Sequence, residues 1–231
     1  MEYVMAEFIL PHLLHIAPRN PVPEIAYPNC SVYAVVDDAY LLLIDTGNGF
    51  SHKSILDDLR AAGLLDGRPI TVLLTHCHVD HVGGVEYFHR SMEICAAPQA
   101  AEHLRIASHR IWYEAPELLR PLVVHTELPP GRRQIGPFAV EVVPTPGHTD
   151  DSLSFVLIID GKCCIFSGDL IMPSGTIGWR GSDDYSQEKL VASLRWLDEQ
   201  QYDYLLTGHD YTGPEMRDRV RKTLEIEESK R

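Results

Sequence analysis

The sequence predicts a layered α/β fold in which β-sheets lie inside and helices lie outside. The chain has 231 residues, of which 45% are hydrophobic, so it is long enough to bury a full core. Two strand-rich halves are each accompanied by helical segments, which is typical of a layered arrangement. No composition break, Gly/Ser linker or short repeat divides the chain. We therefore expect residues 1–231 to form a single domain.

The first half begins with a predicted hairpin, helix and buried strand. Residues 32–36 and 40–44 are apolar, β-rich runs separated by a short turn, which predicts a hairpin. Ser51 is placed to cap the helix that follows, and Gly63 is placed to end it. Residues 70–75 are apolar and β-branched, and they predict a short strand that runs directly into a histidine cluster.

The segment after that cluster predicts more helix than strand. Residues 83–90 are expected to begin a helix, and residues 93–97 to form another short strand. Residues 99–120 are expected to be helical until Pro116 interrupts the pattern.

The second half returns to strands and ends in two helices. Strands are expected at residues 138–143, 153–160, 162–166 and 204–207. Asp160-Gly161 supplies the tight turn between two of them. Asp184 and Gln187 have the spacing of a capping box, and a leucine stripe follows them, which predicts a helix. A charged helix is expected at residues 215–229.

Charge and composition argue against several classes of function. The chain has 20 Lys plus Arg against 33 Asp plus Glu, a formal net charge of −13, and such a surface repels nucleic-acid phosphates. Five cysteines without CxxC spacing favour reduced thiols. No run approaches the roughly 18 apolar residues of a membrane helix, and no cleavage-like site follows the first apolar stretch. We expect a cytoplasmic protein that binds neither nucleic acid nor a membrane.

The most informative motif lies between Thr75 and Gly84. It places four metal-ligand side chains within six positions, directly after a predicted strand. In an extended segment His76 and His78 point the same way, so both can reach one ion. Asp80 and His81 diverge in direction and suit a second ion beside the first. The cluster therefore predicts a metal site.

Three later segments repeat one pattern, in which an apolar run is followed by a small turn and then by one ligand-type residue. These residues are His148, Asp169 and His209. Four strand ends would then deliver five histidines and two aspartates to a common rim, enough for three private ligands on each of two metals plus one shared carboxylate. Such sites hold their ions about 3.5 to 4 Å apart with a hydroxide between them.

In these motifs and their order, the chain resembles the metallo-β-lactamase superfamily, in its glyoxalase II-like (hydroxyacylglutathione hydrolase-like) branch. The matching positions run from Asp45 to Tyr211. The resemblance implies a four-layered αββα sandwich, the metallo-β-lactamase fold, with the metals at one edge. It implies two divalent metal ions, with zinc as the first choice and iron or manganese as alternatives.

The resemblance also assigns a role to each ligand-type residue. The first ion would be held by His76, His78 and His148. The second ion would be held by Asp80, His81 and His209, with Asp169 bridging the two. Asp45, in Asp45-Thr46-Gly47, matches the early Asp-x-Gly element of the family and would orient ligand imidazoles from behind the metals.

The expected reaction is hydrolysis of a small-molecule acyl substrate. Two divalent ions lower the pKa of a shared water, so that hydroxide can attack the carbonyl of a thioester, ester or lactone at neutral pH. Asp80 is expected to orient this nucleophile as a catalytic residue. Arg180, in a glycine-rich stretch, and Tyr211, two residues after His209, are candidate substrate contacts. A homo-oligomer is compatible with the sequence.

One feature separates this chain from glyoxalase II, and one alternative function stays open. Residues 208–212 resemble the Gly-His-Glu-Tyr-Thr stretch of glyoxalase II, which continues into a helical domain that grips glutathione. Only 19 residues follow Thr212 here, so we expect no strong requirement for glutathione. The alternative is a persulfide dioxygenase, a mononuclear iron enzyme that shares almost the same histidine cluster.

Overall fold

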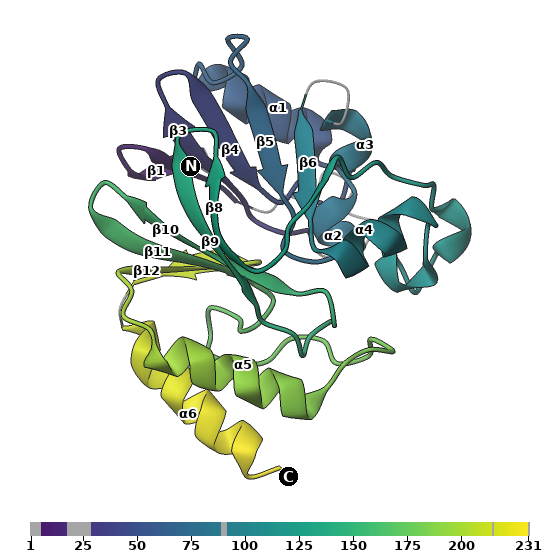
Figure 1. The fold of residues 1–231 in the computed structure, drawn as a ribbon, viewed down its shortest axis with the longest axis vertical. Helices are drawn as coiled ribbons and strands as arrows, with labels where there is room; N and C mark the ends of the chain where they lie inside the picture. Colours follow the sequence, from purple (N-terminus) through teal and green to yellow (C-terminus); the bar gives the residue numbers. More distant parts are fainter. Residues whose placement is uncertain (1–5, 18–28, 89–91, 214, 231) are drawn as a thin grey trace, which may run out of the picture.

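The computed structural model describes residues 6–17, 29–88, 92–213 and 215–230. Two β-sheets pack face to face, and helices lie on their outer sides (Figure 1). The order of layers is helix, sheet, sheet, helix. The predicted αββα sandwich is therefore confirmed.

The first sheet has seven strands in sequence order. Its strands are β1 (Ala6–Leu10), β2 (Leu13–Ile16), β3 (Val32–Asp37), β4 (Tyr40–Ile44), β5 (Ile70–Leu73), β6 (Glu93–Ala96) and β7 (Thr126–Glu127). Pairing is antiparallel from β1 to β4 and parallel from β4 to β7. Helix α1 (His52–Ala61) packs on this sheet through Ile55 and Leu59, which belong to its core cluster. The short helices α2 (Val79–Val82) and α3 (Val85–Phe88) and helix α4 (Pro98–Arg105) follow in the chain.

The second sheet has six strands in the order β13-β12-β11-β10-β9-β8. Its strands are β8 (Gly131–Ile135), β9 (Phe138–Pro144), β10 (Leu153–Ile159), β11 (Lys162–Gly168), β12 (Tyr204–Thr207) and β13 (Asp210–Thr212). Helices α5 (Gln187–Glu199) and α6 (Met216–Glu228) contact each other and cover the outer face of this sheet (Figure 1). Leucines of α5 and Val220 of α6 form a second core cluster with Ile165 and Leu205 of the sheet.

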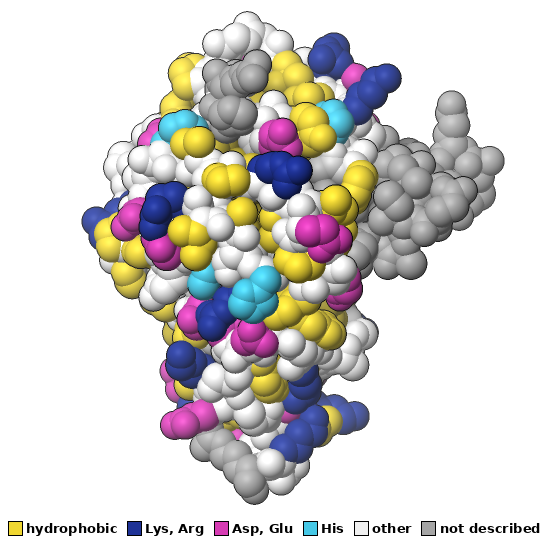
Figure 2. Space-filling model, turned by 90° about the vertical axis from the view of Figure 1, so that its right-hand side faces the viewer, with side chains coloured by type: hydrophobic (Ala, Val, Ile, Leu, Met, Phe, Trp, Pro, Cys, Tyr) yellow, Lys and Arg dark blue, Asp and Glu magenta, His cyan; other side chains and the backbone are white. Residues whose placement is uncertain are grey.

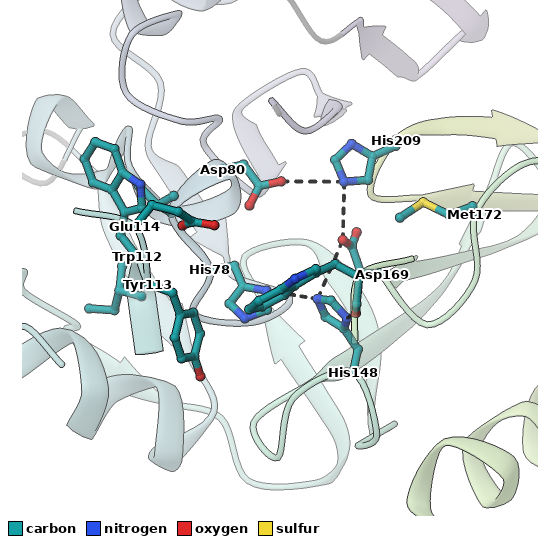
Figure 3. A pocket seen from close by; sticks show the side chains of 12 residues that line it. His78, Asp80, Trp112, Tyr113, Glu114, His148, Asp169, Met172 and His209 are labelled. Carbon is teal, nitrogen blue, oxygen red and sulfur yellow. Dashed lines mark hydrogen bonds and ion pairs between the residues drawn. The ribbon is translucent and has the colours of Figure 1, made fainter. Parts of the chain in front are cut away.

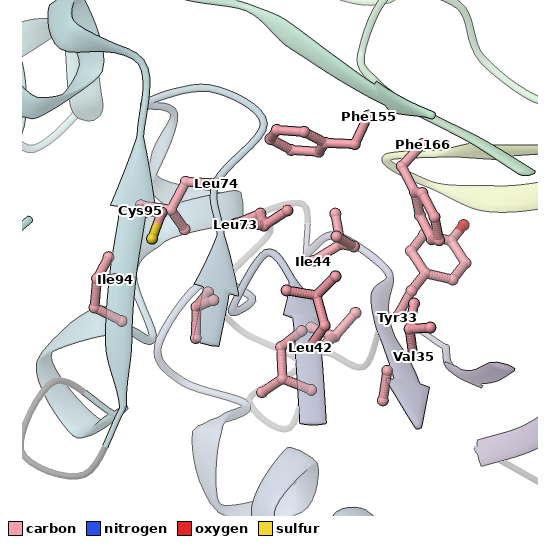
Figure 4. Packing of buried hydrophobic residues seen from close by; sticks show 14 of the residues in the cluster. Tyr33, Val35, Leu42, Ile44, Leu73, Leu74, Ile94, Cys95, Phe155 and Phe166 are labelled. Carbon is pink, nitrogen blue, oxygen red and sulfur yellow. The ribbon is translucent and has the colours of Figure 1, made fainter. Parts of the chain in front are cut away.

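The main core lies between the two sheets (Figure 4). Ile44 and Leu73 of the first sheet and Phe155 and Phe166 of the second are all buried there. Residues 41–44 are buried without alternation, because a strand covered on both faces has no polar side. The Tyr33 hydroxyl, which can donate one hydrogen bond at a time, lies 2.8 Å from the carbonyl oxygens of both Thr207 and Asp210. This contact ties the first sheet to the strand end that carries His209.

The predicted hairpin and the helix after it are confirmed, with one difference at the cap. Helix α1 begins after Ser51 and ends before Gly63, whose φ of 72° needs the left-handed region. The Ser51 side chain does not cap α1. Its hydroxyl instead accepts a hydrogen bond from Asn29 Nδ2 at 2.9 Å, which ties the loop before β3 to the start of the helix.

The long helix predicted at residues 99–120 is wrong beyond its first two turns. Helix α4 ends at Arg105, and Ala107 has a φ of 50°, which no helix tolerates. Two short 3₁₀ turns follow, η1 (His109–Ile111) and η2 (Pro116–Leu118). In η1 the backbone makes short i→i+3 hydrogen bonds, from Ile111 N to Ser108 O and from Trp112 N to His109 O. The side chains of residues 109, 110 and 113 bond to Asp150 and to the loop that precedes α5, which draws the chain away from a continuous helix. The predicted helix at 83–90 is described only up to Phe88, as α3, and its last two positions lie outside the described residues.

The predicted cap of α5 is also corrected. Ser186 is the cap, and its hydroxyl accepts a hydrogen bond from Lys189 N at 3.3 Å. Asp184 has a different role: its carboxylate accepts hydrogen bonds from the Ser182 hydroxyl and from Asp150 N. Asp184 therefore holds the loop around His148 instead of starting the helix.

Strands β1, β2, β7, β8 and β13 were not predicted as separate elements. Strand β8 is exposed along most of its length, so it lacks the alternation that reveals a half-buried strand. On the face shown in Figure 2, Lys and Arg side chains lie scattered among acidic and hydrophobic ones. Within the described residues, every helix is too short or too polar to cross a membrane.

Candidate metal centre

The structure brings all seven predicted ligand residues to one edge of the sandwich. His76 and His78 follow β5, and the short helix α2 carries Asp80 and His81. The remaining three follow strands of the second sheet: His148 after β9, Asp169 after β11 and His209 after β12. Leu153 N donates to Thr75 O at 2.8 Å, so the two sheets are joined beside the cluster.

The first ligand group consists of three buried histidines, His76, His78 and His148. His78 Nδ1 lies 3.1 Å from His76 Nε2 and 2.9 Å from His148 Nε2. Ligand nitrogens about 2.0 to 2.1 Å from a tetrahedral ion lie about 3.3 Å from each other. The three nitrogens are therefore spaced as ligands of one ion.

The second ligand group consists of Asp80, His81, Asp169 and His209. His81 Nε2 lies 3.3 Å from Asp169 Oδ1 and 3.6 Å from Asp80 Oδ2. His209 Nε2 lies 3.3 Å from Asp169 Oδ2 and 3.5 Å from Asp80 Oδ2. Two imidazoles and two carboxylates thus surround one small volume, with His209 the most exposed of the four.

Asp169 connects the two groups. Its Oδ2 lies 3.3 Å from His209 Nε2 in the second group and 3.7 Å from His148 Nε2 in the first. Among the described side chains, Asp169 Oδ1, His81 Nε2 and His78 Nε2 are buried atoms without a hydrogen-bond partner. Buried polar atoms are normally paired. A cation between the two carboxylates and His81 would satisfy the first two of these atoms, so the residues fit a metal.

Backbone carbonyls and Asp45 orient the imidazoles from behind. His81 Nδ1 donates to Asp45 Oδ2 at 2.7 Å, and His148 Nδ1 donates to the carbonyl of Trp179 at 3.1 Å. His209 Nδ1 donates to the carbonyl of Asn29 at 3.1 Å. With Nδ1 protonated, Nε2 of each ring is the lone-pair nitrogen that faces the centre.

Asp45 lies where the sequence placed it, immediately after β4 and behind the ligands. Its Oδ1 accepts from Thr75 N and its Oδ2 accepts from Thr75 Oγ1, both at 2.8 Å. Its φ of 62° lies in the left-handed region, a strained conformation that persists only where the surroundings enforce it. Cys30 lies in the same group as Asp45 and His81. Burial raises the pKa of the Cys30 thiol to about 11, which keeps it neutral at pH 7.

Burial also sets the protonation of the first group. It lowers the pKa of His76 well below its usual range and lowers that of His78 to about 3, and the neighbouring histidines add to both shifts. Both imidazoles are therefore neutral at pH 7, which is the form that binds metals.

Position 208 requires a glycine because the side chains of Asp169 and His81 lie close to its backbone. A Cβ on Gly208 would lie 2.0 Å from Asp169 Oδ1 and 2.7 Å from His81 Cε1. Its backbone is also bonded on both sides, with Gly208 N donating to Gly168 O at 2.8 Å and Gly208 O accepting from Ser31 N at 2.7 Å. Any larger residue would displace two ligands of the second group.

The ligand groups open into a pocket of about 550 Å³ (Figure 3). Half of its lining residues are ligand-type residues and their neighbour Val79. The other half come from two loops: Ile111, Trp112, Tyr113, Glu114, Met172 and Trp179. No Lys or Arg is among the described lining residues.

The two candidate substrate contacts lie elsewhere, and this corrects the prediction. Arg180 Nη2 donates to Glu227 Oε1 at 2.7 Å, so its guanidinium is turned toward α6. The Tyr211 hydroxyl donates to Glu7 Oε1 at 2.9 Å, on β1. Neither residue lines the pocket. Partners in neighbouring elements hold both side chains away from it.

Sequence reasoning missed the aromatic residues of the pocket. Trp179 immediately precedes Arg180. The glycine-rich stretch therefore does contribute to the pocket, but through Trp179 and not through the predicted Arg180. Trp112 and Tyr113 fell inside the predicted helix 99–120, where aromatic residues suggest packing. The only available signal was a pair of adjacent aromatic residues shortly before Pro116.

Comparison with known proteins places these residues in a family. A sequence profile of the Metallo-beta-lactamase superfamily matches residues 27–209. The "Probable metallo-hydrolase YqgX" of Bacillus subtilis is 29% identical over 205 residues, covering 85% of this chain and 90% of that protein. The "Atrochrysone carboxyl ACP thioesterase" of Passalora fulva is 29% identical over 176 residues, covering 74% of this chain and 46% of that protein.

A third relative and one solved structure extend the comparison. The "Acyl-coenzyme A thioesterase MBLAC2" of Gallus gallus is 32% identical over 161 residues, covering 60% of this chain and 56% of that protein. The chain thus spans about half the length of both thioesterases. A motif mutant of the metallo-beta-lactamase from Cronobacter sakazakii superimposes with a TM-score of 0.78 at 19% identity, covering 98% of this chain and 96% of that one. At this identity the likeness shows the fold alone.

The profile match covers most of the chain and includes every residue of both ligand groups. The fold, the order of the ligand-type residues and the profile agree. The chain therefore belongs to the metallo-beta-lactamase superfamily.

Proposed function

We propose that the protein is a metal-dependent hydrolase that acts on a small acyl thioester, ester or lactone through a dinuclear centre. In this proposal His76, His78 and His148 hold one ion, Asp80, His81 and His209 hold the other, and Asp169 contacts both. Zinc is the proposed metal at both positions, because imidazole and carboxylate ligands at tetrahedral spacing suit it.

The observation that carries the proposal is the position of Asp169 at the base of an open pocket. One carboxylate lies within 3.7 Å of a nitrogen of each ligand group. Both groups also line the pocket, the first with His78 and His148 and the second with Asp80 and His209, so ions held there would be within reach of a substrate. Such access distinguishes a reactive site from a purely structural one.

The chain's own residues have distinct tasks in the reaction. Divalent ions at these positions would lower the pKa of a water molecule toward neutrality and polarise the substrate carbonyl. In this proposal Asp80, which lines the pocket, orients the attacking water through its carboxylate. The hydrogen bonds from His81 to Asp45 and from His148 to the Trp179 carbonyl fix the ligand imidazoles before substrate arrives.

Thioesters are the acyl class that the relatives favour. Two of the similar proteins are named as thioesterases, one for an acyl carrier protein substrate and one for acyl-coenzyme A. The sequence resemblance of residues 208–212 to glyoxalase II, itself a thioester hydrolase, points the same way. We extend the proposal to a glyoxalase II-like reaction without a strong requirement for glutathione, since no Lys or Arg lines the described pocket to bind its carboxylates.

Other properties of the chain support a small-molecule substrate inside the cell. The net charge is −13, and the basic side chains on the face in Figure 2 are scattered, which favours a small molecule over nucleic acid. All five cysteines are unpaired, which supports the expectation of the reducing cytoplasm. A homo-oligomer stays compatible with the proposal.

Metal analysis combined with kinetics tests the proposal. The protein is purified without added metal, its metal content is measured, and hydrolysis of a matched thioester, ester and lactone is followed. We expect activity to rise with metal content and to be lost in Asp169→Ala. Asp57→Ala, which changes an exposed aspartate on α1, is the matched control and should retain activity.

Three results would contradict parts of the proposal. Equal hydrolysis by Asp169→Ala and the unaltered protein would exclude the dinuclear mechanism. Oxygen uptake on glutathione persulfide with one bound iron would select the dioxygenase instead. A hundredfold preference for glutathione thioesters, worth about 2.7 kcal/mol of transition-state binding, would overturn the statement on glutathione.

A further inference from the structure

Two aromatic residues outside the ligand groups form one wall of the pocket. Tyr113 follows η1, and Trp179 lies in the loop after β11. Their ring centroids are 5.2 Å apart with an angle of 61° between the planes. Both rings also meet His78 edge-on, Trp179 at 5.5 Å and Tyr113 at 6.4 Å between centroids. The Tyr113 and Trp179 rings thus form a continuous aromatic wall beside His78 of the first ligand group.

The wall is held in place by contacts between its two loops. The Tyr113 hydroxyl lies 3.1 Å from Ser182 Oγ and accepts a hydrogen bond from Asp183 N at 3.0 Å. His109 Nε2 lies 2.7 Å from Asp183 Oδ2, and the Trp179 carbonyl accepts from His148. Surfaces that are fixed before binding lose less conformational entropy when a ligand arrives. The rings are therefore arranged for binding in the free protein.

Outside the ligand groups, the other described lining residues are apolar with one acidic exception. Ile111, Trp112 and Met172 line the pocket without contributing a charge. Glu114 lies outside both ligand groups, and in Figure 3 its carboxylate points from its loop toward the pocket interior. An anionic acyl chain would approach this carboxylate, and like charges brought together reduce affinity.

We propose that Tyr113 and Trp179 are specificity-determining residues that bind a neutral aromatic acyl group, and that Glu114 disfavours anionic acyl groups. Aromatic rings pair favourably edge-to-face or offset at about 4.5 to 7 Å between centroids, so an incoming ring finds partners on this wall. The pocket volume of about 550 Å³ suits such a group with a short thiol leaving arm. The inference rests on the proposed function, because it names the acyl class that the same site takes.

N-Acetylcysteamine thioesters test the aromatic wall, because the leaving group is constant while the acyl group changes. Each kcat/KM is divided by the rate of hydroxide-catalysed hydrolysis of the same compound, which removes intrinsic reactivity. We expect the benzoyl thioester to exceed the acetyl thioester by at least about tenfold, since one methylene in an apolar pocket already discriminates by about 10 to 200-fold.

Variants of the wall residues test whether the aromatic wall causes the preference for benzoyl over acetyl thioesters. Trp179→Ala should reduce the benzoyl-to-acetyl ratio by at least about tenfold, whereas Trp179→Phe, which keeps a ring, should retain most of it. Trp196→Ala is the matched control, because Trp196 lies on α5, packs against the second core cluster and does not line the pocket. An unchanged ratio in Trp179→Ala, with an unchanged melting curve, would overturn the role of Trp179. Tyr113→Ala gives the corresponding test of Tyr113.

Glu114 is tested with succinyl and butyryl thioesters, which have the same chain length and differ in charge. Glu114→Gln should raise the succinyl-to-butyryl ratio several-fold, and added salt should reduce the difference from the unaltered protein. Glu117→Gln is the control, since Glu117 is exposed on the same segment and does not line the pocket. Equal ratios in both variants would remove Glu114 from the proposal.

A binding measurement separates this inference from the proposed function. Phenacyl and acetonyl thioethers of N-acetylcysteamine cannot be hydrolysed, and their dissociation constants can be measured by calorimetry. Tighter binding of the phenacyl compound that is lost in Trp179→Ala supports the aromatic wall. If this result is found while no thioester is hydrolysed, only the proposed hydrolase function is rejected. Hydrolysis without any preference for aromatic groups in either assay would reject only the aromatic wall.

Discussion

Asp45 holds His81 from behind through a hydrogen bond of 2.7 Å between Oδ2 and Nδ1, with both side chains buried. The same carboxylate accepts two hydrogen bonds from Thr75, which also lies 3.1 Å from His76 Nδ1 through its hydroxyl. Asp45 therefore reaches one residue of each ligand group without facing the pocket. Its expected contribution is to ligand orientation.

Replacing Asp45 and Asp169 by asparagine should separate orientation from direct binding. Asp45→Asn should weaken metal binding by about 10 to 100-fold, the usual loss for a residue that orients a ligand. Asp169→Asn should weaken it more, because Asp169 contacts both groups. The loss of metal affinity in each variant is measured as the metal content after dialysis against increasing concentrations of chelator. Asp57→Asn is the surface control. Equal and mild losses would contradict the proposed role of Asp169.

Gly208→Ala should displace Asp169 and His81 and so reduce metal content and activity together. The reason is steric, because the added Cβ would lie 2.0 Å from Asp169 Oδ1. Gly63→Ala is the control for a glycine substitution without a steric clash: its φ of 72° is strained for alanine, but no atom lies within 4 Å of the added Cβ. That control should lose stability, roughly 1 kcal/mol, and keep its metal. Metal retained in Gly208→Ala would show that the loop can move.

Removing the metal should destabilise the fold. Without cations the buried carboxylates of Asp80 and Asp169 depend for compensation on His81 and His209, whose Nε2 atoms lie 3.3 to 3.6 Å away. A ligand at 100 times its Kd stabilises the folded state by about 2.7 kcal/mol, so re-adding metal should restore the melting temperature. Thermal unfolding of metal-free and reloaded protein measures this, with elemental analysis to verify each state. Identical melting curves would contradict a bound metal.

Arg180→Ala should reduce stability more than it changes substrate selectivity. Its guanidinium bonds to Glu227, Tyr185 and Gln187, which joins the loop after β11 to α5 and α6. Loss of this charged pair should cost about 1 to 3 kcal/mol, measured by denaturant unfolding. Normal stability with altered substrate selectivity in this variant would instead indicate that Arg180 contacts the substrate.

The same pair predicts a pH dependence of stability. Burial opposes ionisation of Glu227, but hydrogen bonds from Arg180, Lys230 and Gln187 outweigh it and lower its pKa to about 2. A carboxyl with a depressed folded-state pKa stabilises above its unfolded pKa of about 4.3, and the benefit is lost as pH falls toward 2. The stability difference between the unaltered protein and Glu227→Gln should therefore shrink from pH 6 to pH 3. A constant difference would contradict this assignment.

The elements that were predicted correctly depend on local patterns. The β3-β4 hairpin, α1, and the strands that precede the ligands are encoded by short apolar runs and turn residues. The ligand-type residues of the centre could be identified for the same reason, since each follows a strand within a few positions. A turn after a buried strand restricts where its next side chains can point, so sequence order alone indicated a common rim.

Contacts between distant segments determined the features of the structure that were not predicted from the sequence. Residues 109–113 left their predicted helix because His109, Arg110 and Tyr113 bond to residues 150 and 182–184. Arg180 turned to α6, and Trp179 beside it entered the pocket. The sequence by itself determined the superfamily and the order of the ligand-type residues, because these depend on residue type and local spacing. Only the tertiary structure decided which side chains face the pocket, because that choice depends on partners as far as 204 positions away, the separation of Tyr211 and Glu7.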